Sequence, residues 1–297
     1  MVVGRADTPI APYHRPTGQD GLVRPLVTPT ELAETSTAGE PPVLLDVRWR
    51  LGGPPGIDDY DNGHLPGAVF LDLDTDLAAP PGKAGRHPLP EPDELQATLR
   101  RAGVTASRAV VAYDAADGSV AARAWWLLRW AGHPEVAVLD GGFAAWVAED
   151  RPVTAVAPAP EPGDFVVRPG QLPVLDADQA AELAATGLLL DARAPERFRG
   201  DVEPVDPRAG HVPGARNAPF AAHTDGGRWR SPGELAQRFR ELGVTGDGPV
   251  GAYCGSGVTA SSVVLAMEVA GFAPPALYAG SWSNWSADPD RPVATGD

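Results

Sequence analysis

The sequence predicts an α/β fold with two tandem domains, each a mainly parallel β-sheet flanked by helices. Three observations support this prediction. The chain has 297 residues, about twice the usual size of a single domain. Four sequence blocks occur twice in the same order. Each half also alternates short β-rich runs with helical stretches, which is typical of a parallel sheet.

The repeated blocks indicate that one domain has been duplicated. They pair residues 44–48 (LLDVR) with 189–193 (LLDAR), 63–68 (GHLPGA) with 210–215 (GHVPGA), 110–114 (VVAYD) with 250–254 (VGAYC), and 139–146 (LDGGFAAW) with 278–285 (YAGSWSNW). The spacing between partners is nearly constant along the chain. Agreement in sequence, order and spacing is difficult to explain without duplication, so we expect two copies of one fold.

Proline-rich stretches divide the chain. Residues 1–25 contain several prolines and predict an extended N-terminal arm rather than part of a core. Residues 26–151 then form the first domain, residues 152–173 a Pro-rich linker, and residues 174–297 the second domain. Because a Pro-rich tether is stiff, we expect the two domains to pack in a fixed relation with a cleft between them.

The second half shows the alternation of elements most clearly. The pattern predicts strands at 187–191, 250–253 and 276–278, and helices at 232–242 and 259–270. Each strand is short and apolar, as expected for a sheet covered on both faces.

Composition and charge restrict the function. Lys and Arg total 24 against 39 Asp and Glu, giving a net charge of −15, which argues against nucleic acid as the main partner. An anionic substrate must then be held by a few placed arginines. The start of the chain lacks an apolar signal core and no uncharged run could span a membrane, so we expect a cytoplasmic protein without membrane contact. One cysteine excludes an intramolecular disulfide framework and a cysteine-rich metal site, and no residue cluster has metal-ligand spacing.

The single cysteine, Cys254, is the strongest candidate for chemistry. It follows an apolar strand and precedes a helix, in the run Cys254-Gly255-Ser256-Gly257-Val258-Thr259. The two glycines allow a tight loop whose main-chain N–H groups point inward, and these groups together with the helix N-terminus favour a thiolate. The alternative is a buried structural cysteine. The first copy has Asp114 at the matching position, which assigns the chemistry to the second domain.

A cysteine in such a loop also occurs in phosphatases. Those enzymes need an arginine six positions after the cysteine to bind the transferring phosphoryl group. Ala260 occupies that position here, so a phosphatase is disfavoured.

The chain resembles the two-domain rhodanese family of sulfurtransferases from about residue 25 to 295. Tyr60 followed by residues 64–68 (HLPGA) looks like the first signature of the family, and residues 278–285 are similar to the second. The run CGSGVT at 254–259 is like that of the 3-mercaptopyruvate sulfurtransferases rather than the CRKGVT of the thiosulfate enzymes. A loop without cations also suits a donor whose carboxylate lies away from its sulfur.

The resemblance implies a mechanism and a set of site residues. Cys254 would take sulfur from 3-mercaptopyruvate as a persulfide and pass it to a thiol, cyanide or a thioredoxin-like protein, with no metal or organic cofactor. The loop residues Gly255, Gly257, Val258 and Thr259 would contact the substrate. Ser256 would pair with His87 and Asp74 of the first domain as a polarising or proton-relay set.

Two arginines are implied as ligands of the donor's carboxylate and carbonyl, Arg197 and Arg208. The alternative for both is an ion pair with a neighbouring acid such as Glu203 or Asp206. His64 and His211 recur in equivalent turns of both copies, which indicates a structural role. Two further functions stay open: a thiosulfate:cyanide sulfurtransferase, and a non-catalytic module that senses redox state or persulfide through Cys254.

Overall fold

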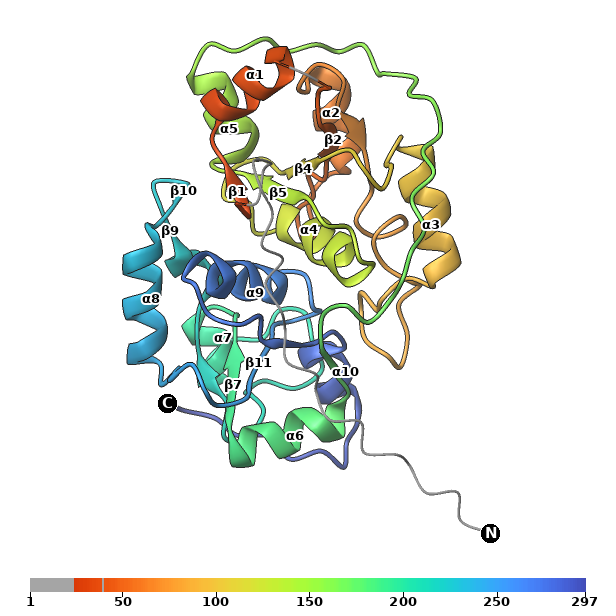
Figure 1. The fold of residues 1–297 in the computed structure, drawn as a ribbon. Coiled ribbons are helices and arrows are strands. Elements are labelled where there is room, and N and C mark those ends of the chain that lie inside the picture. The colour runs from red at the N-terminus through yellow and green to blue at the C-terminus, as the bar shows by residue number, and fades with distance from the viewer. Residues whose placement is uncertain (1–23, 39) are drawn as a thin grey trace.

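The computed structural model describes residues 24–38 and 40–297 (Figure 1). The predicted N-terminal arm therefore lies, except for its last two residues, outside the described residues. Within the described part of the chain, no helix combines the length and apolar character needed to cross a bilayer.

The first domain is a five-stranded parallel sheet with helices beside it. Its strands are β1 (Leu26–Val27), β2 (Val43–Asp46), β3 (Val69–Phe70), β4 (Val110–Tyr113) and β5 (Val136–Leu139). Its helices are α1 (Pro29–Ala38), α2 (Gly56–Asn62), α3 (Pro92–Arg101), α4 (Ala121–Trp130) and α5 (Gly142–Ala148). The strand order is β1-β5-β4-β2-β3, and β2 and β4 are buried throughout, as expected for strands covered on both faces.

The second domain repeats this arrangement. Its main strands are β6 (Val174–Leu175), β7 (Leu188–Asp191), β8 (Arg216–Asn217), β11 (Val250–Tyr253) and β12 (Ala276–Tyr278), in the order β6-β12-β11-β7-β8. Its helices are α6 (Ala177–Thr186), α7 (Pro195–Arg199), α8 (Pro232–Glu241), α9 (Ala260–Val269) and α10 (Ser281–Ala287), with a 3-10 turn η1 (Phe220–His223) and a small hairpin of β9 (Thr224–Asp225) and β10 (Arg228–Trp229). The identical strand order confirms the predicted α/β duplication.

The predicted elements of the second half agree with the structure. Strands expected at 187–191, 250–253 and 276–278 are β7, β11 and β12, and helices expected at 232–242 and 259–270 are α8 and α9, with ends shifted by at most one residue. Helix α8 begins where expected because Ser231 and Glu234 form a capping box, in which each side chain accepts a main-chain N–H of the other residue.

The Pro-rich segment 152–173 contains no helix or strand and lies along the first domain. Its main chain donates hydrogen bonds from Gly163 to the Arg100 carbonyl and from Arg168 to the Ala131 carbonyl, both at 2.8 Å. Phe165 from the same segment is buried in the core. These contacts hold the segment against α3 and the end of α4, so it is packed along its course.

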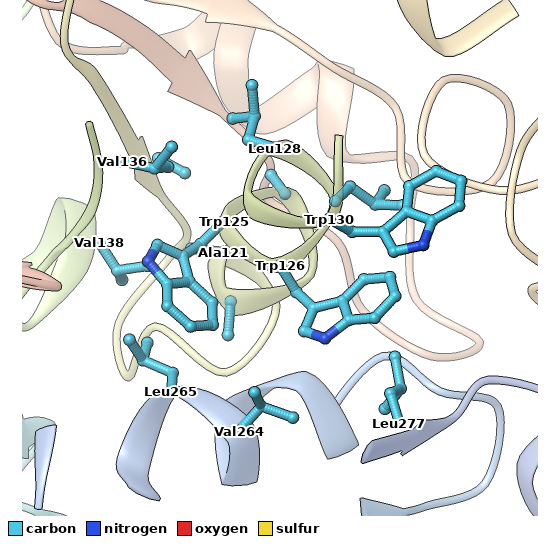
Figure 2. Packing of buried hydrophobic residues seen from close by; sticks show 14 of the residues in the cluster. Ala121, Trp125, Trp126, Leu128, Trp130, Val136, Val138, Val264, Leu265 and Leu277 are labelled. Atoms are coloured by element: carbon cyan, nitrogen blue, oxygen red, sulfur yellow. The ribbon is translucent and has the colours of Figure 1, made fainter. Parts of the chain in front are cut away.

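Helices α4 and α9 form the centre of the contact between the domains (Figure 2). Each follows the loop that ends the central strand of its own sheet, β4 or β11. Trp125 and Trp126 of α4 are fully buried and lie opposite Val264 and Leu265 of α9. Burial of a large apolar side chain contributes roughly 1.5–3 kcal/mol, so this contact fixes the two loops relative to each other.

Candidate active site

Cys254 lies directly after β11 and before α9, at the carboxyl edge of the second sheet. Only 2% of the residue is exposed. Its Sγ accepts the main-chain N–H of Gly257 at 3.1 Å. Its own N–H donates to Ser281 Oγ at 3.1 Å, and its carbonyl accepts the Trp282 N–H at 2.9 Å, so the start of α10 fixes the main chain of the cysteine.

The two loop glycines are needed for different reasons. Gly257 has φ +82°, and a Cβ there would lie 2.5 Å from the Ala279 carbonyl oxygen, so this position requires glycine. A Cβ on Gly255 would instead lie 3.1 Å from Arg86 Nη2 and 3.6 Å from Arg197 Nη1. The absence of a side chain at Gly255 therefore also leaves room for two guanidinium groups beside the loop.

A cavity of about 300 Å³ opens over Cys254, and both domains line it. From the first domain come Trp49, Arg50, Leu51, Arg86, Ser119 and Val120, and from the second Arg193, Ala194, Arg197, Phe220, Cys254, Gly255, Ser256, Val258 and Thr259. The predicted loop residues thus line the cavity, apart from Gly257, which holds the sulfur from within the loop. The volume suits a small molecule.

The structure brings Ser256, His87 and Asp74 into one hydrogen-bonded chain. His87 Nδ1 lies 2.7 Å from Ser256 Oγ, and His87 Nε2 lies 2.9 Å from Asp74 Oδ1. An ionised carboxylate only accepts hydrogen bonds, so Nε2–H donates to Asp74 and Nδ1 accepts the Ser256 hydroxyl. The second domain contributes the serine and the first domain contributes the other two residues.

The surroundings of His87 favour its neutral form. Burial lowers the pKa of His87 below its ordinary value of 6.5, and the positive charges of Arg123 and Arg86 lower it further. Asp74 opposes these effects through its charge and its hydrogen bond. Trp49 fixes the far end of the chain, since its Nε1 donates to Asp74 Oδ2 at 3.0 Å. A neutral imidazole can accept a proton from Ser256.

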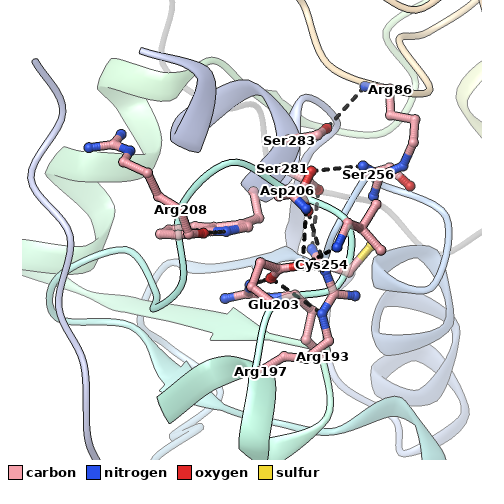
Figure 3. Close-up of polar contacts among 12 residues, drawn as sticks. Arg86, Arg193, Arg197, Glu203, Asp206, Arg208, Cys254, Ser256, Ser281 and Ser283 are labelled. Atoms are coloured by element: carbon pink, nitrogen blue, oxygen red, sulfur yellow. Dashed lines mark hydrogen bonds and ion pairs between the residues drawn. The ribbon is translucent and has the colours of Figure 1, made fainter. Parts of the chain in front are cut away.

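Arg197 lies at the rim of the cavity on α7 (Figure 3). Its Nη2 contacts Glu203 Oε1 at 2.6 Å and Asp206 Oδ2 at 3.3 Å. The ion pairs considered as an alternative are therefore present. Arg197 Nη1 has no hydrogen-bond acceptor among the described residues, and this nitrogen faces Gly255. The side chain is thus partly paired and keeps one donor for a ligand.

The structure does not bring Arg208 to the cysteine. Its guanidinium points away from the cavity and donates to four main-chain carbonyls around the end of α10, those of Trp285, Ser286, Asp288 and Arg291 (Figure 3). Arg208 is also absent from the residues that line the cavity. Four of its five N–H donors are occupied in this way, so the guanidinium supports the end of α10 and does not belong to the site at Cys254.

Two first-domain arginines that the sequence reasoning missed lie at the site. Arg86 lines the cavity, and its Nη1 contacts Asp206 Oδ1 at 2.7 Å. Arg123 of α4 is fully buried and donates to the carbonyls of His87 at 3.1 Å and Gly257 at 3.4 Å. Burial lowers the pKa of Arg123 to about 10, so it remains a cation at neutral pH. Arg86 adjoins His87 in sequence, a signal that could have been used.

Other possible sites are less suited to chemistry. Among residues 24–38 and 40–297, no group of three or more His, Cys, Asp or Glu side chains could hold a metal ion. A larger cavity of about 620 Å³ lies elsewhere between the domains, near β1 and the start of α8. Its lining residues include neither a cysteine nor a histidine. The candidate active site is therefore the cavity over Cys254.

The two repeated histidines have equivalent structural positions. His64 Nδ1 donates to the Tyr60 carbonyl and His211 Nδ1 to the Phe198 carbonyl, each at 2.8 Å. Each ring also stacks on the aromatic ring of the residue whose carbonyl it binds, with centroids 3.8 and 3.7 Å apart. Both side chains are buried outside the cavity, in agreement with the structural role predicted for them.

Comparisons with known proteins agree with this architecture. The Rhodanese-like domain family matches residues 28–149 and 176–288. A Pseudomonas aeruginosa protein named "Probable 3-mercaptopyruvate sulfurtransferase" is 49% identical over 282 residues, covering 92% of this chain and 98% of that protein. A Mycobacterium tuberculosis protein named "Putative thiosulfate sulfurtransferase SseB" is 46% identical over 278 residues, covering 91% and 97%.

Solved structures give the same result. The 3-mercaptopyruvate sulfurtransferase from Leishmania major matches with a TM-score of 0.78 at 29% identity, covering 89% of this chain and 74% of that chain. Both sequence and structure therefore point to one family along most of the chain. The chain belongs to the rhodanese-like domain family, as a member with two tandem copies of the domain.

Proposed function

We propose that the protein is a sulfurtransferase that moves a sulfane sulfur from 3-mercaptopyruvate to an acceptor through a persulfide on Cys254. The observation that carries this choice of donor is the chain from Asp74 through His87 to Ser256, which ends at the cavity beside Cys254. Thiosulfate releases sulfite, which needs no proton. Mercaptopyruvate releases an enolate, which does need one, and a proton relay is then useful.

In the first half-reaction the Cys254 thiolate attacks the sulfur of the donor. A sulfur–sulfur bond forms and the carbon–sulfur bond breaks, leaving its electron pair on the departing carbon as the enolate of pyruvate. The proton of the donor's thiol is transferred to that carbon. The products are pyruvate and an anionic persulfide on Cys254, and neither an oxidant nor a reductant is consumed.

The relay moves that proton. Ser256 accepts it from the donor's thiol and passes its own hydroxyl proton to His87 Nδ1, from where the proton returns to the enolate. Asp74 holds the imidazole in the required tautomer and stabilises the imidazolium that forms. Because Ser256 lies only two residues after Cys254, the relay and the nucleophile contact the same donor molecule.

Main-chain N–H groups stabilise the anionic sulfur in this mechanism. Gly257 already donates to Cys254 Sγ. The N–H groups of Thr259 and Ala260, at the start of α9, have no acceptor among the described residues. They are available to the outer sulfur of the persulfide, a role like that of an oxyanion hole.

The second half-reaction returns the enzyme to its starting state. An acceptor thiolate or cyanide attacks the outer sulfur, the sulfur–sulfur bond breaks, and Cys254 leaves as the thiolate. The acceptor classes we propose are small thiols, cyanide and a reduced thioredoxin-like protein. The persulfide is the only carrier, so no metal or organic cofactor is required. A free thiolate and thiol acceptors suit a reducing compartment, and we include a cytoplasmic location in the proposal.

Mass spectrometry of the intact protein tests the proposal. Incubation with 3-mercaptopyruvate, without acceptor, should add the mass of one sulfur atom to the wild type and none to Cys254→Ser. Addition of cyanide should remove that mass and release thiocyanate. Sulfur transfer by Cys254→Ser would overturn the mechanism.

The second candidate is a thiosulfate:cyanide sulfurtransferase, which the name of the Mycobacterium tuberculosis relative favours. Values of kcat/KM for the two donors, measured on one preparation, decide between the two donors. If neither donor loads Cys254 under saturating conditions, the proposal fails and the redox-sensing alternative gains support.

A further inference from the structure

A loop of the first domain reaches across to the second domain next to the cysteine. The Asn284 side chain of α10 donates to the Lys83 carbonyl at 2.7 Å, and the Arg86 N–H donates to Ser283 Oγ at 3.0 Å. A Cβ on Gly85 would lie 2.8 Å from the Gly280 carbonyl oxygen. The main chain before Arg86 is therefore pressed against the start of α10, and this contact sets the position of the Arg86 side chain.

The guanidinium of Arg86 is only partly paired. Its Nη1 contacts Asp206 at 2.7 Å, and its Nε is buried without a hydrogen-bond partner. No acceptor for its Nη2 is found among the described residues, and this nitrogen faces Gly255. Arg197 Nη1 faces Gly255 from the second domain. Two unpaired guanidinium nitrogens, one from each domain, thus converge beside the residue that follows Cys254.

Asp206 holds this pair of arginines together. Its Oδ1 contacts Arg86 and its Oδ2 contacts Arg197 at 3.3 Å, while Glu203 neutralises the other side of Arg197. The side chain of Asp206 is only 3% exposed, so these ion pairs are little screened by the solvent. The acids therefore fix the two guanidinium groups and leave their cavity-facing nitrogens open to an anion.

We propose that Arg86 is a substrate-binding residue, and that its Nη2 and Arg197 Nη1 together bind the carboxylate of the sulfur donor. This inference rests on the proposed function and replaces Arg208 with a residue of the first domain. A carboxylate accepts two parallel donors well, and both are charged. In mercaptopyruvate the carboxylate lies beyond the ketone from the sulfur, which matches cations placed beside the loop rather than on it.

A pair of donors that differ only in this group tests the assignment. Mercaptoacetone has the thiol and ketone of mercaptopyruvate, with a methyl group in place of the carboxylate. Loss of one charged hydrogen bond predicts that Arg86→Ala raises KM for mercaptopyruvate by about 10–100-fold with kcat nearly unchanged. The rate of persulfide formation from mercaptoacetone should stay as in the wild type. Arg86→Lys should recover only part of the loss, because it keeps the charge without the planar fork.

Arg199→Ala is the matched control. Arg199 lies on the same helix as Arg197, is half-buried outside the cavity and pairs with Asp201, so its loss should change turnover of neither donor. A second measurement uses pyruvate, the carboxylate product, whose Kd by calorimetry should rise in Arg86→Ala by the same factor as KM.

Equal loss with both donors, or unchanged pyruvate binding in Arg86→Ala, would show that Arg86 only joins the domains and would overturn the inference. Failure of the wild type to take sulfur from mercaptopyruvate would instead overturn the proposed function. The wild-type loading experiment and the variant series therefore separate the two failures.

Discussion

The two domains contain equivalent loops with a different side chain at the start of each. In the first domain the Asp114 carboxylate accepts four main-chain N–H groups at 2.9–3.1 Å, from Ala116, Gly118, Val120 and Ala121. In the second domain Cys254 takes the place of Asp114, and its sulfur accepts the N–H of Gly257. Gly118 and Gly257 correspond, with φ values of +74° and +82°.

The comparison shows what the fold itself provides. A loop between the central strand and the next helix gathers N–H donors around one point, and these donors favour an anion there. The first domain fills the point permanently with its own carboxylate. Burial raises the pKa of Asp114, but the N–H groups of Ala121, Gly118 and Val120 oppose this. In the second domain the side chain at this point, that of Cys254, is shorter than the Asp114 side chain. This leaves space for the sulfur atom that is transferred.

The first domain also contributes to the site of the second. It supplies His87 and Asp74 behind Ser256, and Arg86 and Arg123 around the loop. The first copy thus has no nucleophile at the matching position and instead supplies residues to the site of the other copy. The contact of α4 with α9 makes this possible, because it holds the two loops in one arrangement.

The largest expected effect comes from replacing Cys254 of the second loop with aspartate, the residue that the first loop has at this position. Cys254→Asp should abolish persulfide formation completely, since no sulfur nucleophile remains, while the protein stays folded because the loop accepts a carboxylate. Intact mass after donor treatment measures the first effect and thermal unfolding the second. A Tm of Cys254→Asp far below that of Cys254→Ser would contradict the view that the two loops can bind the same carboxylate side chain.

His87→Asn should produce the next largest effect. Loss of the relay removes general acid–base catalysis, which contributes roughly 10²–10⁴-fold, so kcat with mercaptopyruvate should fall by at least about 10². Turnover of thiosulfate, whose leaving group needs no proton, should fall much less. Both rates are measured by thiocyanate release, and His64→Asn, outside the cavity, serves as a comparison for general damage. An equal fall for both donors would refute the relay.

Asp114→Asn tests the hydrogen bonds between the Asp114 carboxylate and the main-chain N–H groups of its loop. The amide NH₂ group of asparagine cannot accept hydrogen bonds from the main-chain N–H groups that donate to the second carboxylate oxygen of Asp114. The free energy of unfolding should therefore fall by about 1–3 kcal/mol. Sulfur transfer per folded molecule should be retained, because Asp114 does not line the cavity. Chemical denaturation and kcat measure the two quantities. Unchanged stability would mean that the carboxylate is not the anchor of this loop.

The pH profile should show the smallest effect. Because burial lowers the pKa of His87 below its ordinary value of 6.5, kcat/KM for mercaptopyruvate should decline on the acid side with a midpoint below pH 6.5. Asp74 raises the pKa of His87, so Asp74→Asn should move this decline to lower pH. The charge of Arg86 lowers that pKa, so Arg86→Ala should move the decline to higher pH. Shifts of the acidic decline in the opposite directions would contradict the placement of Asp74 and Arg86 around His87.

Much of this protein could be predicted from local sequence. The strands around the active loop, helices α8 and α9, and the position of Cys254 between β11 and α9 follow from apolar periodicity, glycines and repeated motifs. The pairing of His87 and Asp74 with Ser256 came from resemblance to a family, since residues so distant in sequence carry no local signal of contact. The structure places all three in hydrogen-bond contact.

The sequence alone thus determined a duplicated α/β fold and a single reactive sulfur after the central strand of the second copy, because strand and helix patterns depend on nearby residues. The tertiary structure alone decided which arginines face that sulfur. Arg123 reaches the active loop because α4 packs on α9, and Arg86 reaches it because its own loop is held against the start of α10. Arg208 instead turns to the carbonyls at the end of α10. The direction of a long charged side chain depends on acceptors that folding brings near it, and those acceptors lie far away along the chain.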